Sequence, residues 1–362
     1  MDFKICTNCC NCFPVTIIGG DALDAIIVVE GQALTLVYSD STKGWIVVNS
    51  GNSTDARVEP KFVAATGGTI TTVCTNFKVH TFTGPGTFTV SCAGNCAGSN
   101  TVDYLVIAGG GAGGAAGGHS GTVGGGGGAG GYRESGGTAS GCYTVSPLGS
   151  SPSPVAALPV TAQGYPITVG AGATSTFPCN SCNTGSNSVF STITSAGGGG
   201  GVGTAPCCGF NGGSGGGGGS TVPVSGNAGN GNTPPVTPPQ GNPGGNGQAP
   251  KQGGGGGGAT TSGTPGQPSN PVRGKGGSGA TSSINGTPTT RAGGGGGANT
   301  NSAPNGGPGG GGAGPPSASG GVGGNGTVNT GSGGGGGPHC APTPSNGGTG
   351  GSGIVIIRYK FQ

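Results

Sequence analysis

Unbroken glycine blocks are the feature that most restricts how this chain folds. Glycine accounts for 96 of the 362 residues, and most of it lies after residue 108. The longest blocks are residues 124–128, 197–201, 215–219, 253–258, 293–297 and 333–337. A glycine block has no side chain to bury, so it cannot build an ordinary hydrophobic core. The region is therefore either a flexible linker or a structure in which backbones pack directly against one another.

Three properties favour packed backbones over a linker. The glycine-rich region extends from residue 109 to residue 352, far beyond the length of normal linkers. Charged residues make up only 6% of the chain, whereas disordered segments are usually rich in charge. The chain also ends in a β-branched run at residues 354–361, which needs a partner strand and a covering layer. We therefore expect the glycine region to be ordered.

The expected form of this order is a bundle of polyglycine II helices. Such a helix has three residues per turn and no internal hydrogen bonds, so every N–H and C=O needs a partner on a neighbouring helix. Only glycine lets the backbones come that close, and the absence of a strict Gly-X-Y repeat excludes collagen. A five-residue block at about 3.1 Å per residue spans about 15 Å, which predicts a thin slab with loops at its ends.

The rest of the chain has β-strand patterns, and no stretch has helical periodicity. We expect an all-β N-terminal region plus a glycine-rich polyglycine II helix sandwich, with essentially no α-helix. The predicted divisions are a β-rich region with a cysteine-rich head at 1–60, a β-strand collar at 61–108, the glycine-rich domain with loops at 109–352 and a closing strand at 353–362.

Two pairings are expected among these strands. The sequence Gly84-Pro85-Gly86 predicts a hairpin turn between strands at residues 77–83 and 87–91. The apolar strands before and after the glycine region, at residues 102–108 and 354–361, are expected to lie close together and close the domain.

Composition argues against several function classes. The net charge of +3 rests on few ionic groups and implies no attraction to nucleic acid or to a membrane. There is no run of about 20 apolar residues for a membrane span, and the first residues lack the apolar core of a signal peptide. With nine acidic residues and no arrangement of paired carboxylates or of Ser, His and Asp, we expect no enzymatic activity.

A dinucleotide fingerprint is present only by pattern. Residues 109–114 match G-x-G-x-x-G after a strand, and Glu134 lies where a ribose-binding carboxylate is wanted. The phosphate would have to sit on a helix N-terminus, and the residues that follow are too rich in glycine to form one, at about 1 kcal/mol per glycine. We therefore expect no bound cofactor of this kind.

Thirteen cysteines leave their own chemistry open. The head cluster of Cys6, Cys9, Cys10 and Cys12 has metal-like spacing and is the candidate zinc site, if a tight loop brings four thiolates together. Cys179 and Cys182 have the same C-x-x-C spacing, and Cys207 and Cys208 are adjacent in the sequence. Disulfides and free thiols are the alternatives, and an odd number leaves at least one cysteine unpaired if all disulfides form within the chain.

Three stretches together identify a family resemblance. The sequences HTFTGPGTFTVSCAG, NTVDYLVIAGGGAGG and GGSGIVIIRYKF, within residues 61–362, resemble the glycine-rich domain of phage tail adhesins and tail-fibre tips, including fibres of marine cyanophages. Residues 34–45 resemble a short β-module of phage structural proteins. An ice-binding protein built from polyglycine II helices would instead have a regular tripeptide, which this chain lacks.

The resemblance implies a virion protein made in the host cytoplasm, whose end loops would contact a host cell-surface glycan or outer-membrane protein. Residues 1–60 depart from a stand-alone adhesin, and we expect them to attach the chain to other virion proteins. Their apolar runs are too short for a large core of their own, so we expect them to assemble as a homotrimer, as fibre proteins commonly do. The alternative is a structural virion component, such as a head fibre, neck fibre or capsid decoration, that uses the glycine-rich domain as a rigid spacer.

Aromatic residues in the least glycine-rich stretches are the candidate receptor contacts, because exposed aromatic side chains commonly anchor recognition. These candidates are Tyr132, Tyr143, Tyr165, Phe177 and Phe210. The alternative is that the same rings pack over the faces of the slab.

Overall fold

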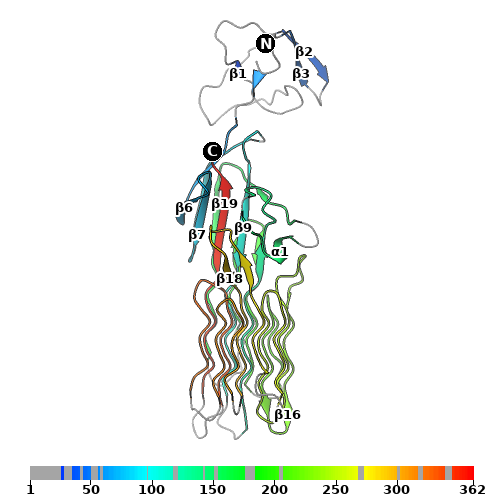
Figure 1. Cartoon of the computed structure of the whole chain (residues 1–362), viewed down its shortest axis with the longest axis vertical. Coiled ribbons are helices and arrows are strands. Elements are labelled where there is room, and N and C mark those ends of the chain that lie inside the picture. The colour runs from blue at the N-terminus through cyan, green and yellow to red at the C-terminus, as the bar shows by residue number, and fades with distance from the viewer. Residues whose placement is uncertain are drawn as a thin grey trace.

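Short strands and extended glycine segments make up almost all of the described chain (Figure 1). The computed structural model describes residues 26–27, 35–40, 44–49, 56–57, 60–95, 97–116, 121–141, 143–150, 154–175, 184–203, 207–267, 273–299, 302–316, 321–338 and 345–362. The one helical turn among them is α1 (Pro147–Ser150), and none of their helices is long and apolar enough to cross a bilayer. The predicted all-β class with essentially no α-helix is confirmed.

Two antiparallel sheets form a β-sandwich at one end of the glycine region. The first sheet has the strand order β10-β9-β19-β7-β6, with β11 also paired to β9, and the second has the order β14-β13-β12-β8-β5. The strands are β5 (Val63–Thr66), β6 (Thr69–Val73), β7 (Phe77–Phe82), β8 (Gly86–Ala93), β9 (Thr101–Ile107), β10 (Tyr132–Glu134), β11 (Leu158–Pro159), β12 (Gly164–Thr168), β13 (Ser188–Phe190), β14 (Ile193–Ser195) and β19 (Ile354–Lys360).

Four two-stranded ladders complete the described secondary structure. They are β1 (Ile26–Ile27) with β4 (Ala56–Arg57), β2 (Thr35–Asp40) with β3 (Gly44–Asn49), β15 (Ser220–Thr221) with β16 (Val224–Ser225), and β17 (Ala280–Ser282) with β18 (Thr289–Arg291).

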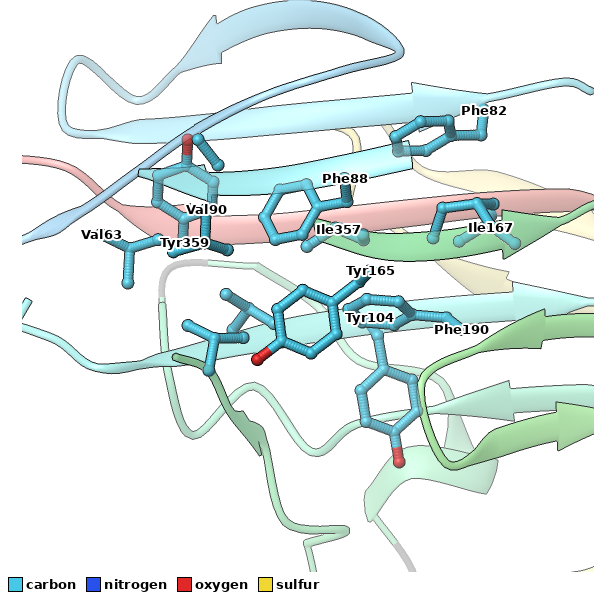
Figure 2. Packing of buried hydrophobic residues seen from close by; sticks show 14 of the residues in the cluster. Val63, Phe82, Phe88, Val90, Tyr104, Tyr165, Ile167, Phe190, Ile357 and Tyr359 are labelled. Carbon is cyan, nitrogen blue, oxygen red and sulfur yellow. The ribbon is translucent and has the colours of Figure 1, made fainter. Parts of the chain in front are cut away.

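The hydrophobic core lies between the two sheets and is built around aromatic rings (Figure 2). Phe88 is fully buried, and its ring packs edge-on against Phe190, with centroids 6.0 Å apart. Tyr359 and Ile357 of β19 reach the same core from the opposite sheet. Aromatic pairs of this geometry stabilise beyond the area they bury, so a few large rings hold together strands that are individually short.

The predicted hairpin at residues 84–86 is wrong. Strand β7 pairs with β6 and β19 in the first sheet, whereas β8 pairs with β5 and β12 in the second. Phe82 and Phe88 flank the turn and both enter the core between the sheets, so the chain crosses from one sheet to the other at this turn. The hairpin in this region joins β6 to β7, through a turn in which Cys74 and Thr75 have positive φ.

The strands on either side of the glycine region do lie together, as predicted. β9 and β19 pair antiparallel from Ile354 opposite Ile107 to Arg358 opposite Asp103. β19 is central in its sheet and buried on both faces. The last strand of the sequence therefore closes the domain that the strand at residues 101–107 opens.

The glycine blocks form a slab of backbones that lie side by side with a threefold hydrogen-bond repeat. Amides three residues apart donate to the same neighbour at 2.7–2.9 Å: Gly124 and Gly127 to segment 333–337, Gly125 and Gly128 to 197–202, and Gly126 and Ala129 to 253–258. Carbonyls of segment 124–129 accept, again three residues apart, from segments 293–298, 109–114 and 213–219. Three residues per turn with bonds to surrounding chains is the predicted polyglycine II packing.

Each central block spans the whole slab. Block 253–258 begins after Gln252 and ends before Ala259, which packs with Leu105 and Ile356 on the outer face of the first sheet. Six residues at about 3.1 Å each give a thickness of about 19 Å. One side of the slab is therefore fixed to the β-sandwich, and the other faces away from it.

We expect slow amide hydrogen exchange in blocks 253–258 and 293–297. The amides of residues 253–257 all donate to carbonyls of other segments, and the Gly258 amide donates to Thr261 in the turn that follows, so exchange in the block requires the slab to open. Mass spectrometry or NMR on the intact protein would measure it. Exchange at random-coil rates throughout residues 196–340 would mean that the glycine region is a linker.

His80 is a buried histidine that links stability to pH. Its Nδ1 lies 2.7 Å from the carbonyl oxygen of Gly67 and must donate, so its Nε2 accepts from the Tyr359 hydroxyl at 3.0 Å. Burial lowers the pKa of His80, against the opposing effect of the Gly67 hydrogen bond. The neutral ring therefore fits the core, and a protonated ring loses its acceptor role toward Tyr359.

This shift predicts that acidification below about pH 6.5 destabilises the fold, because the unfolded histidine takes up a proton before the folded one does. Stability is full above that pH and is lost as pH falls toward the lowered folded pKa. The melting temperature should drop more between pH 7.5 and 5.5 in the wild type than in a His80→Gln variant. Equal drops would assign the effect to groups other than His80. Glu134 would not be one of them, because burial raises its pKa and its protonation therefore favours the fold as pH falls.

Candidate functional site

The side of the slab that faces away from the β-sandwich is the candidate functional surface, and we call it the tip. Figure 1 shows β16 at this end and β19 at the other. The tip comprises Ala116, Thr122, Val123, residues 220–225 and 248–252, Asn299, Pro316, Val322 and Ser345. Here the glycine blocks give way to residues with side chains, so this end offers chemistry that the slab itself lacks.

Isolated β-bridges tie the tip together across the ends of the blocks. Val123 and Ser220 exchange backbone hydrogen bonds of 3.0 and 3.1 Å, and the Ser220 hydroxyl accepts from the Gln252 amide at 2.9 Å. Further bridges join Gln252 to Asn299 and Ala116 to Ser345. Segments that are far apart in the sequence are therefore held in fixed positions where their loops begin.

Exposed apolar residues lie on this surface. Val222 and Val224 of the β15–β16 hairpin are 50% and 42% exposed, and Val322 is 63% exposed. Single exposed apolar residues are normal on any protein, so each alone is weak support for binding. Three exposed valines nevertheless lie together on the tip.

Cysteines give no metal site in the described part of the chain. Cys207 and Cys208 are exposed free thiols, as is Cys74 in the sandwich. The described residues contain no group of three or more His, Cys, Asp or Glu side chains that could hold a metal ion. The head cluster of Cys6, Cys9, Cys10 and Cys12, and also Cys179 and Cys182, lie outside the described residues, so zinc or disulfides there stay predictions.

Two candidate receptor aromatics are part of the interior. Tyr132 is 1% exposed and its hydroxyl donates to Glu134 at 3.0 Å, while Tyr165 is 7% exposed and packs against Phe88 in the core. Burial removes both rings from the set of surface contacts. Tyr165 lies in the core between the two sheets, and Tyr132 packs with Leu105 and Ile356 of the first sheet.

The other candidate aromatics differ in position. Tyr143 is half-buried, and the guanidinium carbon of Arg358 lies 5.0 Å from the centre of its ring, near the sandwich and not at the tip. Phe210 is half-buried on the slab, where its backbone bonds to Gly200 and Gly216. Phe177 lies outside the described residues.

The carboxylates of Asp103 and Glu134 are buried and hydrogen-bonded. Asp103 accepts hydrogen bonds from the Ser135 hydroxyl and from both the amide and hydroxyl of Ser140. Glu134 accepts from the Tyr132 hydroxyl, the Ser146 amide and the Ser282 hydroxyl. Burial raises the pKa of Glu134, although its hydrogen bonds oppose this. Each carboxylate cross-links segments of the fold, and neither reaches solvent as a general acid or base would.

The glycines at residues 109–114 are also occupied by the fold. The amides of Gly110, Gly111 and Gly113 donate to Gly351, Gly128 and Gly348. These are the groups that would have to point at a pyrophosphate. The same pattern that suggests a dinucleotide site is therefore slab backbone.

A protein-family model described as a glycine-rich domain matches residues 82–360. The match begins at the last residue of β7 and ends at the last residue of β19, so it contains the whole slab and most of the β-sandwich. No curated protein matches the chain at a significant level.

Proposed function

The chain belongs to the glycine-rich domain family, and we propose that it is a non-enzymatic adhesin of a phage tail fibre or tail tip that binds a receptor on the bacterial host. The observation that carries this proposal is the contrast between the two ends of the slab. One end is fixed to a β-sandwich with an aromatic core, and the other holds the starts of many loops in place by backbone hydrogen bonds.

Rigidity is what such a scaffold contributes to recognition. Segment 124–129 is bonded to six neighbouring segments, so the slab has no easy hinge along its blocks. Loops that begin from fixed points lose less conformational freedom on binding, which favours affinity and selectivity. The loops are then free to differ in sequence while the glycine blocks stay the same.

The N-terminal region would connect the adhesin to the virion. We place attachment to other virion proteins, and assembly as a homotrimer, in residues 1–60. In that case light scattering on the full chain should give three times the chain mass of 33.3 kDa. A monomer at micromolar concentration would argue against the trimer and for one copy docked on another protein.

Adsorption to cells tests the adhesin proposal. Fluorescently labelled protein is expected to bind host cells, not bind resistant strains, and compete with phage adsorption. Absence of binding, with the protein folded by circular dichroism and melting, would favour the alternative. In that case the domain would serve as a rigid spacer in a head fibre, neck fibre or capsid decoration.

A further inference from the structure

Charge is divided unequally between the two parts of the chain. Residues 1–59 hold seven acidic and three basic residues, a net charge of −4, whereas residues 60–362 hold two acidic and nine basic residues, a net charge of +7. The modest whole-chain charge of +3 hides this difference. Residues 60–362 are thus a cationic unit joined to an anionic one, residues 1–59.

Burial leaves only positive side-chain charge on the surface of the cationic unit. Its two carboxylate side chains, Asp103 and Glu134, are 0% and 2% exposed. Two of its basic residues, Arg291 and Arg358, are buried as well. The seven charged side chains that reach the surface of residues 60–362 are all basic: Lys61, Lys78, Arg133, Lys251, Arg273, Lys275 and Lys360.

Three of these basic residues lie at or beside the tip, and we call them the tip cations: Lys251, Arg273 and Lys275. Lys251 precedes Gln252, the bridged residue at the start of block 253–258. A β-carbon built on Gly274 would lie 2.6 Å from the Gly253 carbonyl oxygen, so Arg273 and Lys275 flank a contact with the same block. Arg273 and Lys275 are exposed and Lys251 is half-buried.

We propose that the tip cations bind an anionic surface polysaccharide, a glycan that carries phosphate or carboxylate groups. This rests on the proposed adhesin function and names its receptor class. A guanidinium and ammonium groups on one rim match oxyanions spaced along a polymer. With no exposed carboxylate side chain in residues 60–362 to oppose it, the positive field also raises the encounter rate with a negative cell surface.

Other ligand classes fit the tip less well. Stacking on aromatic rings is the usual way to grip single-stranded nucleic acid, and the residues that define the tip include no aromatic side chain. The same lack disfavours a neutral glycan, because nothing described there offers a flat apolar face to a sugar ring. Charge is the main chemistry that the described tip offers beyond its exposed valines.

The opposite end of the molecule supplies a matched control. Lys78 and Lys360 lie on the β-sandwich, where their ammonium groups stand 4.9 and 5.2 Å from the ring centres of Phe361 and Phe62. Replacing both removes the same charge as replacing Arg273 and Lys275, but at the other end. A specific role for the tip is therefore separable from an effect of net charge.

The experiment compares the full-length wild type, Arg273→Gln/Lys275→Gln and Lys78→Gln/Lys360→Gln, each checked for an unchanged melting temperature. Binding is measured to polygalacturonate, which carries carboxylates, to phosphorylated dextran and to neutral dextran. We expect binding to at least one anionic polymer only, weakened by raising NaCl, and at least about tenfold weaker in the tip variant, or about 1.4 kcal/mol. The sandwich variant should stay within about twofold of the wild type.

Several results would overturn the inference. Three are equal losses of polymer affinity in both variants, equal binding of neutral dextran, and equally tight binding of duplex DNA. The fourth is self-association that only the tip variant lacks, because the tip cations would then bind the acidic N-terminal region of a second copy. Cell adsorption separates the two proposals. If the tip variant adsorbs to host cells like the wild type, the proposed role of the tip cations is wrong and the adhesin proposal stands. If the wild type binds the polymer but no cells, the adhesin proposal is wrong.

Discussion

Replacing Gly295 by valine is expected to prevent the slab from forming. A β-carbon at this position would overlap the carbonyl oxygen of Gly334 and lie 2.6 Å from its carbonyl carbon, with the Gly127 amide nitrogen at 3.2 Å. All of these atoms belong to backbones that are hydrogen-bonded on every side, so none has room to move. The loss should reach several kcal/mol, a large part of a domain's total stability of about 5–15 kcal/mol.

Gly84→Val is the matched control for this substitution. No atom lies within 4 Å of a β-carbon built at Gly84, which stands in the turn between β7 and β8, and its φ is not in the left-handed region. The residue before a proline favours extended backbone, which valine adopts readily. Soluble yield and thermal unfolding should be near wild type for Gly84→Val and severely reduced for Gly295→Val. Wild-type melting in the second variant would place block 293–297 on a flexible rim.

The slab was predictable from the sequence because its cause is local and repeated. A block of five or six glycines leaves backbone hydrogen bonding as the only source of order, and threefold packing satisfies every amide at once. The pairing of β9 with β19 was also predictable, since both are apolar runs that need two covered faces. Both arguments need only local information: which segments have no side chains, and which apolar strands must be covered on both faces.

Pairing between short strands was not predictable in the same way. Strands β12, β13 and β14 lie within the glycine-rich region, yet they return to complete the second sheet of the sandwich. Two of them have three residues each, too few for a periodic pattern. The turn at residues 84–86 has the composition of a hairpin but joins two sheets, because the distant strand β19 occupies the edge of β7 that a hairpin partner would need.

The candidate surface depended on burial, which composition does not report. Tyr132 and Tyr165 stand in the same glycine-rich context as residues on the surface, and only the fold places them inside. Asp103 interrupts an apolar strand, and that interruption was the available signal that its carboxylate is buried and hydrogen-bonded. The tip cations were visible in the sequence, but their meaning required knowing that both carboxylates of the domain are covered.

The second large effect is expected in the β-sandwich, from Ile357→Ala. Ile357 is fully buried in β19, the central strand of the first sheet, and it faces the aromatic core. Truncation removes buried methyl groups and leaves a cavity among rings that cannot close over it. The expected loss is about 2–5 kcal/mol, measured by urea or thermal unfolding.

The same sheet contains the control, Ile70→Ala. Ile70 pairs with His80 on one side of β7, and Ile357 pairs with His80 on the other, so the two isoleucines lie in one cross-strand row. Ile70 is on the edge strand β6 and is 43% exposed, so its truncation should change stability by less than about 1 kcal/mol. Equal losses at the two positions would mean that β19 is not the central strand of the folded domain. A large loss at Ile357 alone would show that β19 stabilises the sandwich to which the slab is fixed. If cell adsorption is lost at the same denaturant concentration as the sandwich, then recognition at the tip depends on the folded sandwich.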